Sequence, residues 1–185
     1  MKDILFLAKT NKEVKNILNA KEVLVDMVRR REDKFNVGLM DTISIPALKE
    51  NYRMIINVNG KLDYIKIDEK EASLKICKIT GKTKHKKGTQ ISLFDGRNII
   101  TDNDQYKVGD SLLIELPKQN IKEFIKLDKN STVLLVGGKH LGTIAIIEDI
   151  KDNMIKCKAK DLVFETSKKY AFVVGNEKTI LRIEK

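Results

Sequence analysis

The sequence contains no tryptophan, and aromatic residues make up only 5% of its 185 positions. Because nucleic-acid bases stack on aromatic side chains, we do not expect stacking to be this protein's main means of binding. The chain has two cysteines, Cys77 and Cys157, which lie far apart and form no Cys-x-x-Cys motif. This spacing argues against a zinc site and a disulfide framework, and we predict that Cys77 is a small core residue.

Long apolar runs are also missing. No stretch approaches the roughly 20 apolar residues that a membrane-spanning helix needs. The short run near the N-terminus does not suffice for the apolar part of a signal peptide. We therefore expect a soluble, cytoplasmic protein without a membrane partner. Prolines number only two and no Pro/Ser/Gly-rich linker separates the segments, so we expect closely packed modules.

Positive charge is what the sequence has in excess. Lysine and arginine total 36 against 26 aspartate and glutamate residues, which gives a formal net charge of +10 and a pI near 9.5. An excess of this size indicates a polyanionic partner, for which RNA, DNA and a membrane surface are the candidates. No expected helix carries a broad apolar face, which disfavours the membrane surface.

The first 51 residues predict a small α/β module. Thr10 and Glu13 form a capping box, in which the threonine hydroxyl accepts from the amide of Glu13 and the carboxylate reaches back. Apolar residues follow at helical spacing, and Lys12 and Lys15 lie on the opposite face. With a short strand at Val23–Val25 and a basic turn after it, this layout suggests RNA binding. An amphipathic helix with a solvated lysine face is the commoner explanation.

Beyond residue 51 the patterns predict short antiparallel strands, which are typical of small barrels and not of a βαβ sheet. Asn59-Gly60 and Asp95-Gly96 each separate two apolar runs and so predict hairpins. We place soft domain boundaries near Asn51 and Lys129. The expected modules therefore cover residues 1–51, 52–129 and 130–185.

Two helical interruptions are expected among these strands. Asp68 is placed to cap a short helix, and Ile121, Phe124 and Ile125 have the spacing of one or two helical turns. The last third returns to strands, which we predict at Thr132–Val136, Thr143–Ile147, Met154–Lys158 and Tyr170–Val174.

Catalytic chemistry finds little support in the sequence. The two histidines, His85 and His140, lie in lysine-rich segments without a carboxylate spaced to orient either one as a general base. Gly137–His140 superficially resembles a phosphate-binding loop, but it lacks the Ser/Thr after the lysine and the upstream glycine. No cluster of His, Cys and Asp has metal-ligand spacing. We expect no enzyme, no catalytic residue, no cofactor, no metal and no small-molecule substrate.

Nucleic-acid binding finds more support, from a lysine run without carboxylates. No acidic residue occurs between Glu71 and Asp95, and glycines bracket the densest lysines, so we predict an exposed basic loop at Gly81–Gly88. For such a loop taken alone, a solvated charge run that binds nothing is an equal alternative. Two further basic features favour phosphate contacts: the helix stripe with Arg29–Arg31, and the turn at Gly137–His140.

Several residues keep two interpretations. Arg97 contacts RNA or pairs with Asp95 or Asp102. Gly137-Gly138 lets the backbone approach RNA or only supplies a turn, and Phe94 either packs or stacks on a base. Three aromatic residues are expected in the core or half-buried in strands: Tyr52, Tyr64 and Tyr106.

Ordered motifs run through the whole chain: Val37–Ile45, Asn51–Arg53, Phe94–Ile99, Tyr106–Asp110, Leu116-Pro117, Val136–Gly142 and Phe164–Thr166. Their order resembles the archaeal and eukaryotic small-ribosomal-subunit protein 4e family, from about Ile4 to the C-terminus. The resemblance implies a mainly β protein with a small α/β N-terminal module of the αL RNA-binding type. It also implies a central β domain particular to the family and a C-terminal KOW/SH3-like barrel. Family members begin with a longer basic extension, so the αL-type module is expected to be truncated.

The resemblance further implies a structural constituent of the small ribosomal subunit, ribosome-bound in the cytoplasm. Its partners would be small-subunit ribosomal RNA and neighbouring ribosomal proteins. The alternative is a free KOW-bearing RNA- or protein-interaction module outside the ribosome. The residues expected to contact RNA are basic and lie in the features described above: Lys12, Lys15, Arg29, Arg30, Arg31, Lys34, Lys82, Lys84, Lys86, Lys87, Arg97, Lys139 and His140.

Overall fold

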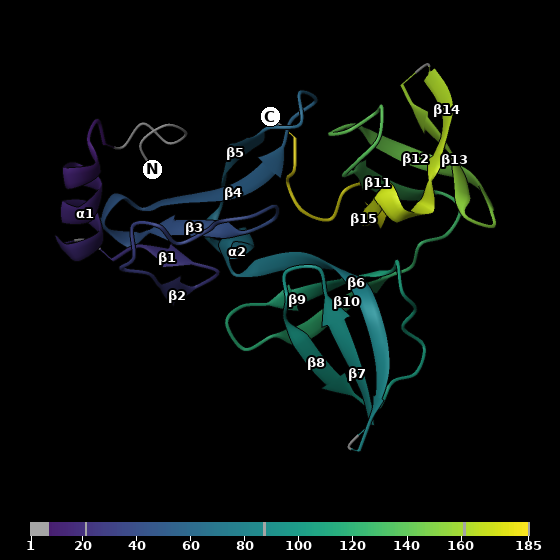
Figure 1. Cartoon of the computed structure of the whole chain (residues 1–185), viewed down its shortest axis with the longest axis horizontal. Helices are drawn as coiled ribbons and strands as arrows, with labels where there is room; N and C mark the ends of the chain where they lie inside the picture. The colour runs from purple at the N-terminus through teal and green to yellow at the C-terminus, as the bar shows by residue number, and fades with distance from the viewer. Residues whose placement is uncertain (1–7, 21, 87, 161, 185) are drawn as a thin grey trace.

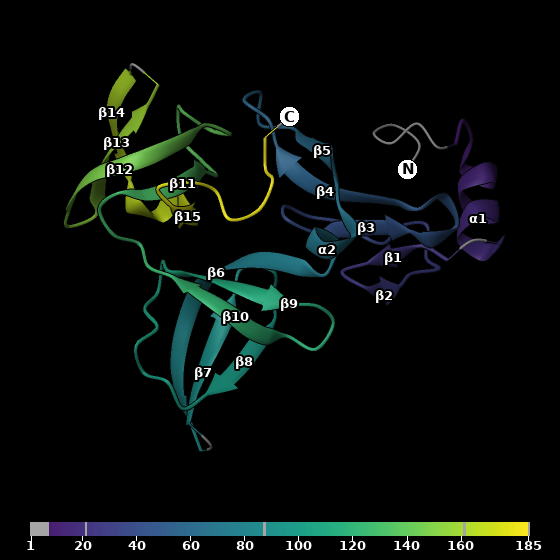
Figure 2. The same ribbon diagram turned by 180° about the vertical axis from the view of Figure 1, so that it is seen from behind.

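Figure 1 shows a computed structural model of the chain, which describes residues 8–20, 22–86, 88–160 and 162–184. Its strands form three antiparallel sheets of five strands each, so the prediction of a mainly β protein is confirmed. The sheets occupy three arms of the molecule, and Figure 2 shows the same arrangement from behind. Within the described ranges, no helix is long and apolar enough to cross a membrane.

The first sheet has the strand order β2-β1-β3-β4-β5 and is covered at one end by a helix. The capping box is present at that helix, since the amide of Glu13 donates to the Thr10 hydroxyl at 3.2 Å. Leu18 of the helix is buried in a cluster with Val23 and Ile43. The elements are α1 (Asn11–Ala20), β1 (Leu24–Val25), β2 (Val28–Arg29), β3 (Thr42–Ile45), a 3-10 turn (Pro46–Leu48), β4 (Glu50–Ile56) and β5 (Leu62–Ile67).

The predicted boundary near Asn51 lies inside β4. Asn51 pairs with Ser44 of β3 on one side and with Ile67 of β5 on the other, so the first sheet continues to residue 67. A short helix, α2 (Glu69–Ala72), then leads into the second sheet. Asp68 occupies the N-cap position as expected, but its side chain makes no capping hydrogen bond.

The second sheet has the order β10-β9-β6-β7-β8 and is built around one long strand. That strand pairs with β9 through its first half and with β7 through its second half, with a bulge between Ile79 and Gly81. The predicted loop at Gly81–Gly88 is therefore wrong, because the lysine run continues the strand to a hairpin end where His85 opposes Gly88. The strands are β6 (Leu74–His85), β7 (Gly88–Leu93), β8 (Asn98–Thr101), β9 (Ser111–Glu115) and β10 (Asn120–Ile125).

The helical turns expected near Ile121 are also absent, because β10 covers these residues. A bulge between Ile121 and Glu123 breaks the strand's alternation. One extra residue at this point sets Ile121, Phe124 and Ile125 at spacings of three and one, which imitate a helical period. The periodicity was therefore that of a bulged strand.

The third sheet has the order β14-β13-β12-β11-β15, and four of its strands match the predicted ones. The strand β14 was not predicted. From β15 the chain returns toward the first two sheets, where Leu181 and Ile183 are buried. The elements are β11 (Ser131–Leu135), β12 (Ile144–Lys151), β13 (Met154–Ala159), β14 (Leu162–Ser167), a 3-10 turn (Lys168–Tyr170) and β15 (Ala171–Asn176).

One hydrophobic cluster joins all three sheets. It contains Ile55 of β4, Ile76 of β6 and Phe172 of β15, each at most 7% exposed, together with other residues of the three sheets. The ring of Phe94 packs edge-on against Phe172 with centroids 5.1 Å apart, which assigns Phe94 to the core. The three sheets thus pack closely, as the scarcity of linkers predicted.

Candidate nucleic-acid interface

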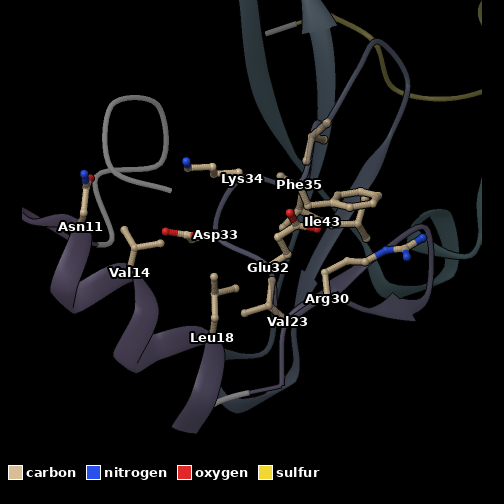
Figure 3. A pocket seen from close by; sticks show the side chains of 12 residues that line it. Asn11, Val14, Leu18, Val23, Arg30, Glu32, Asp33, Lys34, Phe35 and Ile43 are labelled. Atoms are coloured by element: carbon tan, nitrogen blue, oxygen red, sulfur yellow. The ribbon is translucent and has the colours of Figure 1, made fainter.

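In the region of the first basic feature, a cleft of about 330 Å³ lies between α1 and the segment after β2, and Arg30 lines it together with Lys34, Glu32 and Asp33. Figure 3 shows Val14 and Leu18 of α1 on one side of this cleft and the ring of Phe35 on the other. Lys12 and Lys15 are exposed on the helix, and Lys15 lies 3.5 Å from a carboxylate oxygen of Asp33. Since the Lys15 side chain is 62% exposed, this pair contributes little to stability.

The arginines after β1 divide between surface and packing. A tight turn with positive φ at Asp26 and Met27 leads into β2, and Arg29 and Arg31 are exposed beyond it. Arg30 instead lies over the ring of Phe35, 4.1 Å from its centroid, and is half-buried. Two arginines of the predicted three therefore present their charge to solvent, as does Lys34.

The second feature is the free end of the β6–β7 hairpin, where Lys82, Lys84 and Lys86 are exposed. Lys82 donates to the backbone carbonyl of Asp104 at 2.8 Å and lies 3.5 Å from its carboxylate. A hydrogen bond from Thr89, followed by Lys82, lowers the pKa of Asp104 below its usual value. Lys87, the fourth predicted lysine of this hairpin, lies outside the described residues.

No sequence pattern indicates that carboxylates approach this lysine run. Asp102 and Asp104 follow β8 and line the same hollow as Lys82 and Lys84. Gly88 has φ +122°, and a side chain there would meet the carboxylate of Asp102 and the backbone of Thr101. The hairpin end therefore packs against the segment after β8, while Lys84 and Lys86 are exposed.

The same strand also contains a lysine that is buried. Lys75, near the start of β6, is 1% exposed, and its ammonium group lies 2.7 Å from Asp26, 2.5 Å from Asp41 and 3.0 Å from Asp95. Burial acts to lower the pKa of Lys75, but the charges of Asp26 and Asp41 outweigh it and raise that pKa. This network joins the first sheet to the second through buried charge.

Arg97 belongs to this network. Its Nη2 lies 2.6 Å from Asp26 and its Nε lies 3.6 Å from Asp95, and the side chain is 22% exposed. Of the two interpretations of Arg97, the pairing with Asp95 is therefore present. Asp26 is a further partner, which the sequence does not indicate because it lies 71 positions away. Nη1 of Arg97 is buried without a hydrogen-bond partner among the described residues.

Two of the three carboxyls around Lys75, Asp41 and Asp95, have pKa values that are shifted in opposite directions. Burial raises the pKa of Asp41 above its usual value, and the charge of Lys75 only partly offsets that. Asp95 is also affected by burial, yet the charge and hydrogen bond of Lys75 and the amide of Arg97 bring its pKa below the usual value. The Cys77 thiol donates to Asp95 at 3.6 Å, and burial raises the pKa of that thiol.

The third basic feature, Gly137–His140, presents one exposed cation. The ring of Tyr170 covers Gly137 and Gly138, and a side chain at Gly137 would overlap it. This contact supports the interpretation of the glycines as a structural turn. His140 stacks on Phe164, with ring centroids 3.9 Å apart and planes 18° apart, and is half-buried, so Lys139 is the exposed cation of this turn.

Two cations have structural roles at the junctions between sheets that the sequence did not predict. Arg53, fully buried in β4, donates to the carboxylate of Glu71 at 2.8 Å and to the backbone carbonyl of Arg182 at 2.9 Å. Lys78 of β6 donates to the carbonyls of Lys169 and Ala171 at 2.8 and 2.7 Å. A bond to a distant backbone carbonyl gives no pattern in a sequence, so neither role could be found there.

The exposed cations do not form one continuous site. The helix α1 and the free end of the β6–β7 hairpin lie on different arms of the molecule, as both views show. Within the described part of the chain, no group of His, Cys, Asp and Glu could hold a metal ion. Both cysteines are buried and unbridged, as predicted for Cys77. The arrangement suits contact with a large anion at several separate points.

Comparison with known proteins links this arrangement to ribosomes. The model described as ribosomal family S4e matches residues 48–121. A protein of Methanosphaera stadtmanae named small ribosomal subunit protein eS4 is 40% identical over 190 residues, which cover 99% of this chain and 78% of that relative. The protein of the same name from Methanocaldococcus jannaschii is 39% identical and covers 99% of this chain and 80% of that relative.

A solved structure extends the likeness to the fold. The crystal structure of the 30S ribosomal protein S4e from Thermoplasma acidophilum superimposes with a TM-score of 0.81 at 32% sequence identity. The match covers 95% of this chain and 91% of the other. The three-sheet architecture is therefore shared over nearly the whole chain.

Proposed function

The chain belongs to the ribosomal family S4e, and on that premise we propose that it is a structural constituent of the small ribosomal subunit that binds ribosomal RNA. The observation that carries this proposal is 40% identity over 99% of the chain to a protein named for that subunit. A net charge of +10 agrees with a polyanionic partner. The family is structural, and nothing in the described residues points to catalysis.

The RNA contacts would come from the cations that the fold leaves exposed. Lysine is a flexible point charge that suits phosphate oxygens, and each neutralised phosphate releases counterions, which makes the affinity depend on salt. Because these cations lie on separate arms, the protein would bridge RNA segments and recognise their shape more than their sequence. The proposed contacts are Lys12, Lys15, Arg29, Arg31, Lys34, Lys82, Lys84, Lys86 and Lys139.

The other predicted residues take a secondary place in the proposal. Arg30, Arg97 and His140 already pack on Phe35, pair with Asp26 and stack on Phe164, so direct phosphate contact would compete with these interactions. Lys87 keeps its predicted role, supported by its sequence position next to Lys86.

We also infer three modules, with the first limit moved beyond Asn51. The sheets group residues 24–67, 74–125 and 131–176, and α1 (Asn11–Ala20) belongs to the first group because it packs on that sheet. The helix and hairpin of the first group have the order expected of an αL-type RNA-binding module. The third group has the five short antiparallel strands expected of a KOW/SH3-like barrel. A deletion series expressed in isolation and followed by circular dichroism would test which groups fold alone.

Co-sedimentation tests the proposed function. A tagged full-length chain, expressed in the organism that encodes it, is expected in the small-subunit peak of a sucrose gradient at physiological salt. It should leave that peak at high salt, because phosphate contacts weaken as counterions accumulate. A chain that stays with the free proteins at physiological salt would overturn the ribosomal proposal and favour the interaction module outside the ribosome.

A further inference from the structure

The strand β14 is an edge that the chain itself does not cover. It ends the third sheet beside β13, and among the described residues no backbone group bonds to its outer side. Figures 1 and 2 both place β14 at the periphery of the molecule. Its first two residues, Leu162 and Val163, are 68% and 46% exposed.

The other sheet edges are blunted in ways that β14 is not. At the other edge of the same sheet, Val174 of β15 already accepts a hydrogen bond from Ile180 at 3.0 Å. In the remaining sheets β2 and β8 are short, β10 carries a bulge and two charges, and β5 carries two charges. Proteins use these devices to keep edges from pairing. By contrast β14 is six residues long, pairs with β13 without a bulge and carries only Glu165 as a charge.

Apolar side chains flank this edge on both faces of the sheet. Val163 opposes Lys158 of β13, which opposes Ile146 of β12, and Ile146 is itself 43% exposed. On the other face Leu162 and Phe164 follow each other at the two-residue period of a strand. An added strand with apolar side chains at alternate positions would therefore bury surface that is now in water.

We propose that β14 takes an extended segment of another protein as an added strand. The segment would have apolar side chains at alternate positions and carboxylates toward its ends, because Lys160 and Lys169 stand exposed at the two ends of β14. Backbone hydrogen bonds supply the affinity in this mode, and alternate side chains supply the specificity. The inference does not depend on the ribosomal role.

A second copy of this chain fits the edge less well. An antiparallel pair of β14 strands would set Lys160 of one copy beside Lys169 of the other, within chains that each carry a net charge of +10. RNA also fits less well, because Leu162 and Val163 at the strand's start offer phosphate no partner. A protein segment satisfies the backbone, the apolar side chains and the terminal lysines together.

Selection from a phage-displayed library of random octapeptides on the full-length chain tests the proposal. The recovered peptides are expected to alternate apolar residues and to carry acidic ends. Fluorescence anisotropy with the synthetic consensus peptide should give binding that V163K and L162K each weaken by about tenfold or more. A version of the peptide that is N-methylated at alternate residues should lose binding similarly, because its side chains are unchanged but its donors are gone.

The matched control is I100K, which places the same charge at a 49% exposed apolar position on the edge strand β8. It should change the affinity for the peptide by no more than about twofold, which is well below the tenfold loss (about 1.4 kcal/mol) expected for V163K and L162K. Peptides that bind V163K and L162K as tightly as the wild type, or a library without enriched peptides, would overturn the proposal. So would dimers that V163K abolishes in light scattering, or displacement of the peptide by small-subunit RNA fragments.

Discussion

The lysines in the two halves of β6 have different environments and different roles. In the first half, Lys75 lies against three carboxylates, and Lys78 donates to two backbone carbonyls, one in the 3-10 turn before β15 and one at the start of β15. In the second half, Lys82 and Lys84 lie on the exposed end of a hairpin. One strand therefore helps to hold the three sheets together at its start and carries exposed charge at its end.

This difference shows that lysines in one run of like charge can have different roles. The chain between Glu71 and Asp95 lacks carboxylates in sequence, yet Asp26, Asp41 and Asp104 approach it from other segments. A bulge between Ile79 and Gly81 marks the change of partner strand from β9 to β7. Cations before the bulge stabilise the fold, and we propose that cations after it bind RNA.

The largest expected effect is that of K75M in the first half of β6. Methionine keeps much of the side-chain volume but leaves Asp41 buried without a cation, and leaves Asp26 and Asp95 with Arg97 alone. Breaking a buried charge network in this way costs about 3–5 kcal/mol of the free energy of unfolding. Urea denaturation measures it, and K84M in the second half should stay within about 0.5 kcal/mol of the wild type. A loss for K75M as small as that of K84M would contradict the division of the strand.

A smaller loss of stability is expected for K78M. The carbonyls of Lys169 and Ala171 would lose a charged donor at the junction of the second and third sheets. An unsatisfied acceptor of this kind costs about 1–3 kcal/mol. Its control is K82M, whose partner Asp104 has an 81% exposed side chain. Because surface ion pairs contribute at most about 1 kcal/mol, K82M should unfold at nearly the wild-type urea concentration. Equal losses for both variants would mean that the inward hydrogen bonds contribute no more than the outward pair.

The outward half is tested by the triple variant K82E/K84E/K86E on a small-subunit RNA fragment. Stability should hold, whereas the slope of log affinity against log salt should flatten by about 2 to 3, since three phosphate contacts are lost. The control K118E/K122E/K126E makes the same change of net charge on and around β10, where we propose no contact. If the control flattens the slope equally, net charge alone governs binding and the hairpin is only a solvated face.

The smallest effect is a pH dependence within the buried network. Asp95 has a lowered pKa in the folded protein, so the folded form binds fewer protons and stability is lost as pH falls below about 4. Asp41 has a raised pKa, so the folded form binds more protons and its contribution opposes that loss. Urea midpoints between pH 3 and pH 6 should therefore fall less steeply for D95N than for the wild type, and more steeply for D41N. The same slope for both variants would contradict the assignment.

Local patterns predicted much of the fold. The Thr10–Glu13 capping box, the hairpins at Asn59-Gly60 and Asp95-Gly96, and four of the third sheet's strands all occur where the sequence placed them. These features depend on neighbouring residues, so a local pattern carries them. The prediction failed at β10, where a bulge imitates a helix, and at Gly81–Gly88, where charge density suggested a loop.

The sequence alone determined the basic character of the chain and its family. The net charge is the sum over the charged residues, and the family motifs are recognised by their order along the chain. Which cations serve the fold and which remain for a partner was decided only by the tertiary structure. Asp26 reaches Lys75 across 49 positions, and Arg53 reaches Arg182 across 129. Such partners meet only when sheets pack, and burial then makes each lost pairing costly. A lysine's sequence neighbours therefore do not reveal whether its charge is available.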